Sequence, residues 1–532
     1  MTPVSGLPLR HAFGGIDWFM LVAYAGAVLG VGFYYARRQR TTEEYFLGGR
    51  STHPFLAGIS YFTATTSIIT YIGTPGEYVQ YGPGLVFFAA LPALPIVQIL
   101  VGRYLIPFIM RLPITSAYEL LESRLGMSVR KTGSLTYMIT RFVWMALILF
   151  TCSTVMVNVT GCDPRWGYVF AIATGAITTT YTLFGGLKAV MITEVIQFFM
   201  LVLGAVLTLI LITVRLGGFR AWLPSHAEAH WQPQPVFGLD FHIRAILWVA
   251  FTYNVIALVC TAGSDQSAIQ RLLTTRDAPA ARRAYLLNNL ANAGVTVLLG
   301  LVGAALIAFY RTNPQAAPGL TLARNGDAFF PYFISHELPR GISGLVVASL
   351  LAMAMSCLSA GINALITIIT KDFIETRLNR PKPTQKAELK MTRVLAIIIG
   401  TAVVLGSIAV GHVSGNIYEV AGKTVNLLGC PLFGLFFLAM FVKSATPFGA
   451  IMGAVFSAAS AVMVGYWDVL TGRPEMSFNW IGPVSFVVSL AAGCLFSLLP
   501  TRGRSKGVLV GYSAGSLGLL ALLIGILVTN YR

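Results

Sequence analysis

The stretch "GISYFTATTSIITYIGTPGEYVQ" at residues 58–80 has the length and apolar content of a membrane span, yet its middle is interrupted. Gly73, Pro75 and Gly76 lie there, and polar residues crowd before them. Where a transmembrane helix unwinds, its amides and carbonyls lose their internal partners, and lipid cannot replace them. Such a break is therefore expected to line a cavity or to bind a ligand, and a cation is a natural partner for freed carbonyls.

A second interrupted span reads "TYNVIALVCTAGSDQSAIQRLL" at residues 252–273, where Gly263, Ser264 and Asp265 end the apolar run. The two interrupted spans lie five spans apart. Because that offset is odd, the corresponding helices point in opposite directions through the membrane. This arrangement predicts an inverted repeat of five spans plus five, with a broken helix opening each half. A simple kink at Gly or Pro is the alternative for either break alone, since such kinks are tolerated in transmembrane helices.

The composition predicts an all-α membrane protein. Of the 532 residues, 56% are hydrophobic and only 11% are charged, whereas soluble domains carry about 25% charged residues. Long apolar segments recur along the whole chain, as expected for a polytopic protein whose spans are helices. The fourteen expected spans are 16–36, 54–80, 83–110, 133–157, 166–184, 188–214, 242–270, 286–310, 341–370, 393–411, 417–441, 446–466, 480–499 and 508–530.

The repeat divides these spans into four expected parts, all packed in lipid as one transport unit that we expect to be monomeric. The parts are 1–53, an extra N-terminal transmembrane helix with an inner loop; 54–214, the first repeat of five helices; 215–441, the second repeat of five helices; and 442–532, three C-terminal transmembrane helices.

The formal net charge of +17 does not indicate a nucleic-acid partner, because the charges lie in short loops between apolar segments. With the N-terminus placed outside, 24 of the 37 Lys and Arg residues fall in inner loops. This excess satisfies the positive-inside rule, and an even number of spans then puts the C-terminus outside as well. We therefore expect a multi-pass protein of the cell inner (plasma) membrane, with the lipid bilayer as its surroundings and both termini outside.

Five stretches, in a constant order across residues 16–500, resemble the sodium/solute symporter family, which includes sodium-coupled glucose, proline, sialic acid, iodide and monocarboxylate transporters. One is close to the family signature GG-x-x-AV-x-x-T-[DE]-x-x-Q, and another to its AAxMSSLSSxxNS helix. The stretches are "YFLGGRS" (45–51), "YTLFGGLKAVMITEVIQ" (181–197), "GSDQSAIQRLLTTRD" (263–277), "LLAMAMSCLSAGINALITIITKDF" (350–373) and "GKTVNLLGCPLFGLFFLAMFVKSATPFGAIMG" (422–453).

The resemblance implies a LeuT-type 5+5 inverted repeat with about 14 transmembrane helices. It also implies a secondary active transporter that couples Na⁺ to the symport of a small organic solute by alternating access. In the family, a sodium ion lies between the first and eighth repeat helices. By that resemblance the ligands are the carbonyls of Thr63 and Thr66, with Met353, Ser356 and Cys357 on the eighth helix. Cys357 stands where the family usually has Ser or Thr, and a thiol is a poor ligand for a hard cation.

Glu194 stands where the family usually has Asp, so the resemblance places it in a second cation site or on the ion's exit route. A carboxylate at membrane depth is costly unless it pairs or faces water. The alternative is structural: Glu194 snorkels to the inner interface or pairs with a basic loop residue. Because a carboxyl group can also carry a proton, and because of Cys357, a proton-coupled symporter is the alternative function.

Position-by-position matching to the family gives a mostly apolar substrate site, in which a polyol would leave hydroxyl groups without partners. We therefore expect a small organic anion, a carboxylate, as the solute; a neutral sugar or amino acid is the alternative. Lys423 is the expected cationic contact, unless Glu419 four residues earlier neutralises it. Arg141 is expected near the inner mouth in a structural role. The candidate substrate residues are Thr65, Thr70, Leu91, Trp144, Thr261, Lys423 and Asn426.

Two other classes of function fit the sequence less well. No HExxH or phosphate-loop motif falls in a span, so an enzyme is not expected. A channel would not require paired broken helices. Small-molecule solute and Na⁺ are thus the expected ligands, and Na⁺ is the only expected cofactor, as coupling ion.

Overall fold

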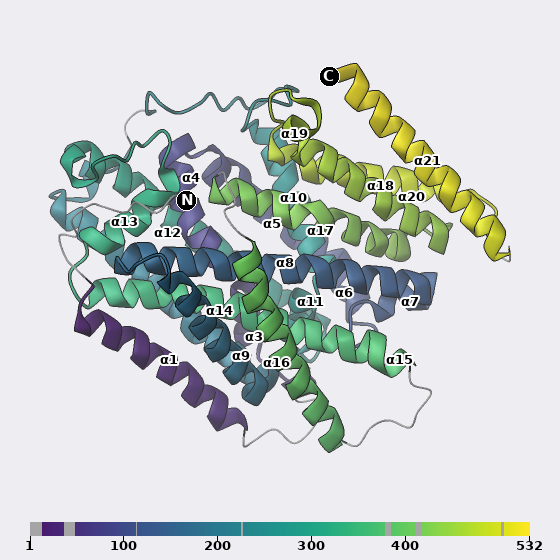
Figure 1. Cartoon of the computed structure of the whole chain (residues 1–532), viewed down its shortest axis with the longest axis horizontal. Helices are drawn as coiled ribbons and strands as arrows, with labels where there is room; N and C mark the ends of the chain where they lie inside the picture. The colour runs from purple at the N-terminus through teal and green to yellow at the C-terminus, as the bar shows by residue number, and fades with distance from the viewer. Residues whose placement is uncertain are drawn as a thin grey trace. The chain divides into compact units, whose positions relative to one another are not determined.

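Regular structure in the described part of the chain is entirely helical (Figure 1). The computed structural model describes residues 13–36, 48–112, 114–224, 227–377, 385–410, 416–501 and 505–531. Helices satisfy their backbone groups internally, which is the requirement for a segment surrounded by lipid. Part of the predicted orientation rests on basic residues at 37–40, 380–382 and 502–504, which lie outside the described residues.

Twelve helices in the described ranges are long and apolar enough to cross a membrane, and the bent pair of α3 and α4 adds a thirteenth. The 50-residue helix α9 is long enough for two spans, and its backbone breaks at Gly186, with φ 56° and ψ −170°. The predicted spans at 166–184 and 188–214 lie on the two sides of this break. All fourteen expected spans are therefore found as helices.

The spans have the following bounds: α1 Gly15–Ala36; α3 Pro54–Thr65 with α4 Ile68–Tyr81; η2 Gly84–Ala89, α5 Ala90–Leu100, η3 Val101–Leu105 and α6 Ile106–Ile109; α8 Met127–Thr160; α9 Trp166–Arg215; α10 Leu247–Ser264; α12 Ala278–Thr312; α14 Ile342–Ile368 with η6 Ile369–Ile374; α16 Gln385–Ala409; α17 Ile417–Phe441; α18 Pro447–Gly465; α20 Ile481–Ser497; and α21 Lys506–Tyr531. Shorter helices include α7 Glu119–Leu125, α11 Gln266–Leu273, α13 Gly326–His336 and α19 Trp467–Thr471.

The first break is real, but its predicted place was wrong. The chain bends by 68° between α3 and α4, where Thr66 and Ser67 are extended. The Ser67 hydroxyl accepts a hydrogen bond from the amide of Ile69 and so caps the start of α4. Residues 73–76, predicted to be the break, continue α4 as helix.

Close packing explains Gly76, one of the residues that suggested the wrong place. A Cβ on Gly76 would lie 2.3 Å from a carboxylate oxygen of Asp327, at the start of α13. A Cβ on Gly326 would lie 2.4 Å from the carbonyl of Gly76. Small residues in this part of α4 thus let α13 pack against its backbone, and they do not unwind it.

The second break lies where the sequence predicts it. α10 ends at Ser264, Asp265 is extended, and α11 begins at Gln266. The Asp265 carboxylate accepts hydrogen bonds from the amides of Ser267 (2.7 Å) and Ala268 (3.2 Å), which caps α11. An acidic residue at this position also complements the positive end of the helix.

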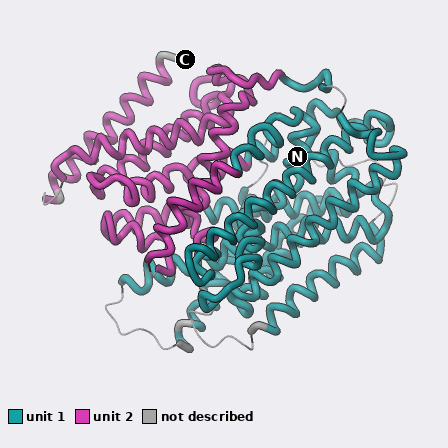
Figure 2. The backbone as a smooth tube through the Cα atoms, turned by 180° about the vertical axis from the view of Figure 1, so that it is seen from behind, with its two compact units in different colours: residues 1–94, 141–232, 270–420 teal, residues 95–140, 233–269, 421–532 magenta. Residues whose placement is uncertain are grey.

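The contacts divide the chain into two units, coloured separately in Figure 2. The first unit comprises residues 1–94, 141–232 and 270–420, and within it α14 packs against α9, α1 and α3. The second comprises residues 95–140, 233–269 and 421–532, and within it α18 packs along α20. Each unit contains segments of both predicted repeats, so the repeat boundaries stay a prediction from the sequence.

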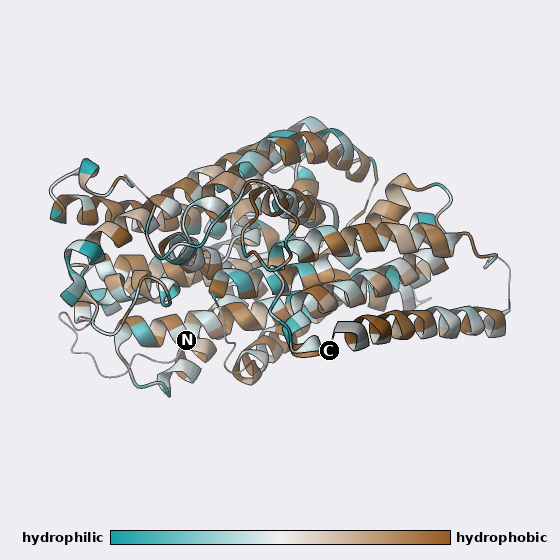
Figure 3. Cartoon of the chain, turned by 90° about the horizontal axis from the view of Figure 1, so that it is seen from above, coloured by the Kyte–Doolittle hydropathy of each residue, from teal (hydrophilic) through white to brown (hydrophobic). Residues whose placement is uncertain are grey.

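Many large hydrophobic side chains of the helices are exposed, and brown, hydrophobic segments occur along most of the ribbon in Figure 3. The clearest case is α21: only 6% of its most hydrophobic stretch is buried inside the protein. In water such a surface would be unfavourable, whereas in a bilayer it contacts lipid. The exposed apolar faces therefore agree with a protein surrounded by membrane.

Candidate functional site

The centre of the first unit is α14, and the motif "MAMSCLSAG" at 353–361 lies on it. Every residue of this motif is buried. Its small side chains let α3 and α9 approach closely, as is common between helices in membranes. The hydroxyl and thiol groups of the motif therefore lie against backbone rather than against solvent.

The predicted sodium ligands Thr63 and Ser356 are in direct contact. The Ser356 hydroxyl donates a 2.9 Å hydrogen bond to the Thr63 carbonyl at the end of α3. Since the last carbonyls of a helix have no intrahelical partner, and the end of the helix carries a partial negative charge, this is a suitable place for a cation. Met353 is buried one turn earlier on α14.

The Cys357 thiol lies at the same carbonyls. Its Sγ donates to the carbonyls of Thr66 at 3.2 Å and Ala64 at 3.5 Å. A hydroxyl in this position would offer lone pairs to an ion, whereas a thiol is a soft, weak ligand. The oxygens of Thr63, Thr66 and Ser356 fit a hard cation, and the thiol is the part of the predicted ligand set that fits poorly.

Arg141, expected in a structural role near the inner mouth, reaches these carbonyls from α8. Its buried guanidinium donates through Nη2 to the carbonyl of Cys357 at 3.1 Å and to that of Ala64 at 3.3 Å. Gly361 makes room for it, because a Cβ there would lie 2.8 Å from Arg141 Nε. An arginine inside a span was the only signal for this role in the sequence.

Glu194 is held in a buried polar cluster in the first unit. Its carboxylate accepts a 2.7 Å hydrogen bond from Arg271 Nη2, and both side chains are 0% exposed. Its other oxygen accepts a hydrogen bond from the Ser60 hydroxyl. Glu194 does not snorkel to an interface, and the basic residue that neutralises it is Arg271. The sequence did not single out Ser60 or Arg271, because both contacts join segments far apart in the chain.

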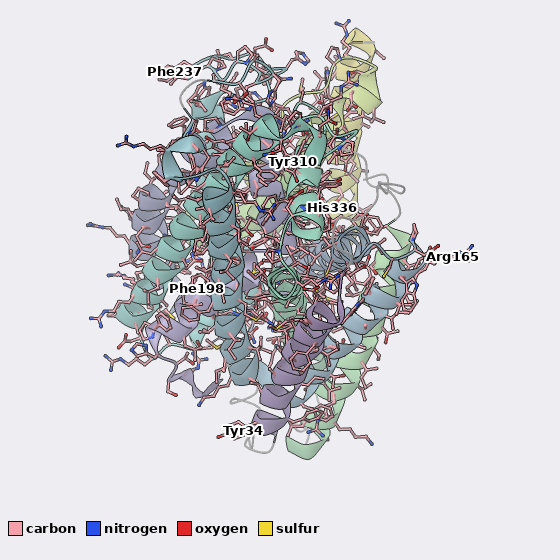
Figure 4. All side chains as sticks on the ribbon, turned by 90° about the vertical axis from the view of Figure 1, so that its left-hand side faces the viewer. Tyr34, Arg165, Phe198, Phe237, Tyr310 and His336 are labelled. Atoms are coloured by element: carbon pink, nitrogen blue, oxygen red, sulfur yellow. The ribbon has the colours of Figure 1, made fainter. Side chains whose placement is uncertain are left out.

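Ser60 connects this cluster to the break. It lies one turn before Thr63 on α3, and the Thr63 hydroxyl donates to the carbonyl of Ser60 at 3.2 Å. Behind this turn, Phe62 packs edge-on against Phe198 of α9, with ring centroids 5.7 Å apart; Phe198 is labelled in Figure 4. The Glu194 cluster and the predicted sodium ligands are therefore consecutive parts of one α3 face.

Four predicted substrate residues belong to the first unit: Thr65, Thr70, Leu91 and Trp144. Thr65 is half-buried at the end of α3, and its hydroxyl donates to the carbonyl of Tyr61 at 3.0 Å. Thr70 is half-buried in the first turn of α4, and Leu91 is half-buried at the start of α5. Trp144 is buried on α8, one turn after Arg141.

The other three predicted substrate residues belong to the second unit. The Thr261 hydroxyl bonds back to the carbonyl of Ala257 at 2.9 Å. The Asn426 amide donates to the Tyr253 hydroxyl at 2.7 Å, and both lie inside the unit. Lys423 lies 3.8 Å from a carboxylate oxygen of Glu475, whose side chain is 64% exposed. Glu419, the expected alternative partner of Lys423, belongs to the first unit.

The second unit also contains an apolar cavity of about 390 Å³. None of the predicted substrate residues lines it. Its walls are hydrophobic and aromatic, from η3, α10, α17 and α20: Leu100, Tyr104, Leu105, Val255, Ile256, Val259, Phe433, Phe437, Phe441 and Phe486. Such walls offer nothing to a carboxylate, so this cavity is separate from the predicted solute contacts.

Comparisons with known proteins show the family to which the chain is similar. The model of the "Sodium:solute symporter family" matches residues 45–456. The chain is 29% identical to the sodium/sialic acid symporter SiaT of Proteus mirabilis, covering 91% of this chain and 95% of that protein. It is 28% identical to the sodium-coupled monocarboxylate transporter 2 of Danio rerio, covering 82% of this chain and 69% of that protein.

Solved structures show the same fold. A substrate-bound, outward-open Na⁺-coupled sialic acid symporter superposes with a TM-score of 0.79 at 28% identity, covering 91% of this chain and 98% of that one. The nucleobase-cation-symport-1 family transporter Mhp1 superposes with a TM-score of 0.52 at 13% identity, covering 85% and 92%, and shows likeness of fold alone. The predicted all-α membrane fold of the LeuT type is thereby confirmed.

Proposed function

Since this chain belongs to the sodium:solute symporter family, as its motifs predict, we propose that it couples Na⁺ bound at Thr63, Thr66, Met353 and Ser356 to the uptake of a small carboxylate. The chain is a multi-pass membrane transporter rather than an enzyme, and Na⁺ is its coupling ion. Transport would proceed by alternating access, in which the ion and the solute bind together and one face of the protein closes before the other opens.

The hydrogen bond from Ser356 to the Thr63 carbonyl carries the sodium part of this proposal. It joins α14 to the end of α3 through two oxygens, which are the type of ligand that a hard cation prefers. An ion between these oxygens would draw α14 and α3 together. Its release would weaken that link, which is how ion binding can favour one conformation over another.

Three observations support a carboxylate as the solute. The names of two relatives refer to sialic acid and to monocarboxylates, both of which carry a carboxylate. By the resemblance to the family, Leu91 and Trp144 make the substrate site mostly apolar, which disfavours polyols. Lys423 supplies a positive charge on α17, 3.8 Å from a carboxylate oxygen of Glu475. Thr65, Thr70, Thr261 and Asn426 would supply the remaining hydrogen bonds.

Uptake into proteoliposomes tests the proposal. A Na⁺ gradient should drive accumulation of at least one member of a panel of radiolabelled carboxylates, amino acids and sugars, and a pH gradient alone should not. The Ser356→Ala variant should need more Na⁺. Ser407→Ala is the matched control, since Ser407 is a buried serine of α16 whose hydroxyl bonds locally to Val404. Uptake driven by protons and indifferent to Na⁺ would favour the proton-coupled alternative.

We also propose that both termini face outward in the plasma membrane, from the distribution of basic residues. Single cysteines introduced at the start of α1 and in the last turn of α21 should react with an impermeant maleimide in intact cells. Labelling only after permeabilisation would contradict this orientation.

A further inference from the structure

The oxygens at the break between α3 and α4 already have a positively charged partner. Arg141 donates to the carbonyls of Ala64 and Cys357. Ala64 lies between the two carbonyls proposed to bind sodium, and Cys357 directly follows Ser356 in the chain. The two carbonyls that bind the guanidinium therefore belong to residues that directly follow proposed sodium ligands in the chain, namely Thr63 and Ser356.

This contact has an electrostatic consequence. Carbonyl oxygens at the end of a helix stabilise one nearby positive charge, but two charges side by side repel strongly where water is scarce. Arg141 is permanently charged, so it cannot relieve the repulsion by losing a proton. An ion entering beside Ala64 must therefore compete with the guanidinium, or displace it.

The surroundings of Arg141 are shaped to admit it at this place. Gly361 on α14 lies against the side chain, and any larger residue would bring a Cβ to 2.8 Å from Arg141 Nε and 2.3 Å from Met145 Sδ. Glu194, one possible partner for a cation here, already accepts hydrogen bonds from Arg271 and Ser60. The acceptors that Arg141 uses at the break are main-chain carbonyls, which an ion can take over.

We propose that Arg141 is a tethered cation that competes with the coupling Na⁺ for the oxygens of this break, and thereby sets the sodium affinity. The proposal rests on the sodium site proposed above. Without the ion, Arg141 and the Cys357 thiol together satisfy carbonyls that lipid could not hydrogen-bond. When Na⁺ binds, the guanidinium withdraws from Ala64 and Cys357, and the ion takes its place as the positive charge.

Sodium binding to the purified protein tests this competition without any need for the solute. Binding of ²²Na⁺, and the rise in melting temperature with Na⁺ at constant ionic strength, would be measured for four variants besides the wild type. In Arg141→Gln the competing charge is absent, and we expect Na⁺ to bind about tenfold more tightly, equal to about 1.4 kcal/mol. In Arg141→Lys the compact ammonium cannot bridge both carbonyls as the planar guanidinium does, so we expect a smaller gain.

Arg103→Gln is the matched control, because it removes an arginine from another span whose side chain is exposed; its Na⁺ affinity should equal that of the wild type. Equal or weaker Na⁺ binding in both Arg141 variants would overturn the proposal, since a merely structural arginine predicts that outcome. If Arg141→Gln folds poorly, Arg141→Lys decides, and a larger Na⁺-induced stabilisation than in the wild type is the expected result.

Ser356→Ala separates this inference from the proposed function. If Ser356→Ala weakens Na⁺ binding while the Arg141 variants do not tighten it, the sodium site stands and the competition is wrong. If Ser356→Ala leaves Na⁺ binding unchanged, the proposed sodium site itself is wrong.

Discussion

Arg271 Nη2 lies 2.7 Å from Glu194 Oε1, and the two side chains are completely buried against α3 in the first unit. The Ser60 hydroxyl donates to the second carboxylate oxygen. A buried ion pair with its hydrogen bonds satisfied is tolerated, whereas either charge alone would be strongly unfavourable. The Glu194 carboxylate is therefore neutralised and held in place by Arg271, a residue from a distant part of the chain.

We expect Glu194→Gln to destabilise the protein by about 3–5 kcal/mol, because it leaves the Arg271 charge buried and unpaired. The double variant Glu194→Gln with Arg271→Met should recover most of this loss, while Glu194→Asp, which keeps the charge, should be mild. Thermal unfolding of the purified variants measures the effect. Additive losses in the double variant would show that the two residues do not stabilise each other.

Ser356→Ala should raise the Na⁺ concentration for half-maximal uptake about tenfold or more, since a hydrogen-bonding or coordinating group to a charged partner is worth about 1.5–3 kcal/mol. The maximal rate at saturating Na⁺ should change less than the Na⁺ requirement. The measurement is initial uptake against Na⁺ concentration, with Ser407→Ala as the control described above. An unchanged Na⁺ curve would remove Ser356 from the ligand set.

Cys357→Ser should lower the Na⁺ requirement several-fold. The hydroxyl would keep the contact to the Thr66 carbonyl and would add a hard oxygen ligand in place of the soft sulfur. Since serine and cysteine have similar shapes, little repacking of α14 is expected. The same uptake curves measure it, and identical curves for variant and wild type would mean that position 357 does not contact the ion.

Lys423→Gln should raise the KM for the solute about tenfold while leaving the Na⁺ requirement unchanged, if its ammonium binds the carboxylate. Lys443→Gln, which removes an exposed lysine from the same unit, is the control. Competition by unlabelled carboxylates and neutral analogues would be measured alongside. Unchanged solute affinity in Lys423→Gln, or competition by neutral compounds alone, would show that Lys423 has a structural role in α17 and does not bind the solute.

His336, at the end of α13 and outside the spans, predicts a pH effect on stability. The ring of His336, labelled in Figure 4, stacks on Tyr332 with centroids 3.8 Å apart. Burial lowers the pKa of His336 below its usual 6.5, against the opposing effects of the Tyr332 carbonyl and Glu337. The unfolded chain therefore binds this proton more readily than the folded one, so stability should fall as the pH drops below about 6.5.

Melting temperatures between pH 5 and 8 check this effect. The His336→Gln variant should lose part of the pH slope, whatever its absolute stability, while His242→Gln, at an exposed histidine, should keep the wild-type slope. An unchanged slope in His336→Gln would mean that other groups cause the pH dependence.

The sequence alone determined the features that a lipid environment requires of each membrane-spanning segment. Lipid offers no hydrogen bonds, so each span must be an apolar helix of minimum length, and hydropathy reveals it. The fourteen expected spans follow from this requirement, and so does the break at Asp265, because the apolar run ends there. The motifs added the family, since they keep their order along most of the chain.

Only the tertiary structure decided which small and polar residues interrupt a helix and which allow a neighbouring helix to pack closely. Gly76 suggests a break by itself, yet α13 packs closely against it, and the chain instead opens at Thr66 and Ser67. Likewise, Arg271 reads as a loop residue and Arg141 as a structural one until their partners are known. Glu194 lies 77 residues from Arg271, and Cys357 lies 216 residues from Arg141. Such pairings depend on which helices pack together in three dimensions, and no local pattern in the chain encodes that.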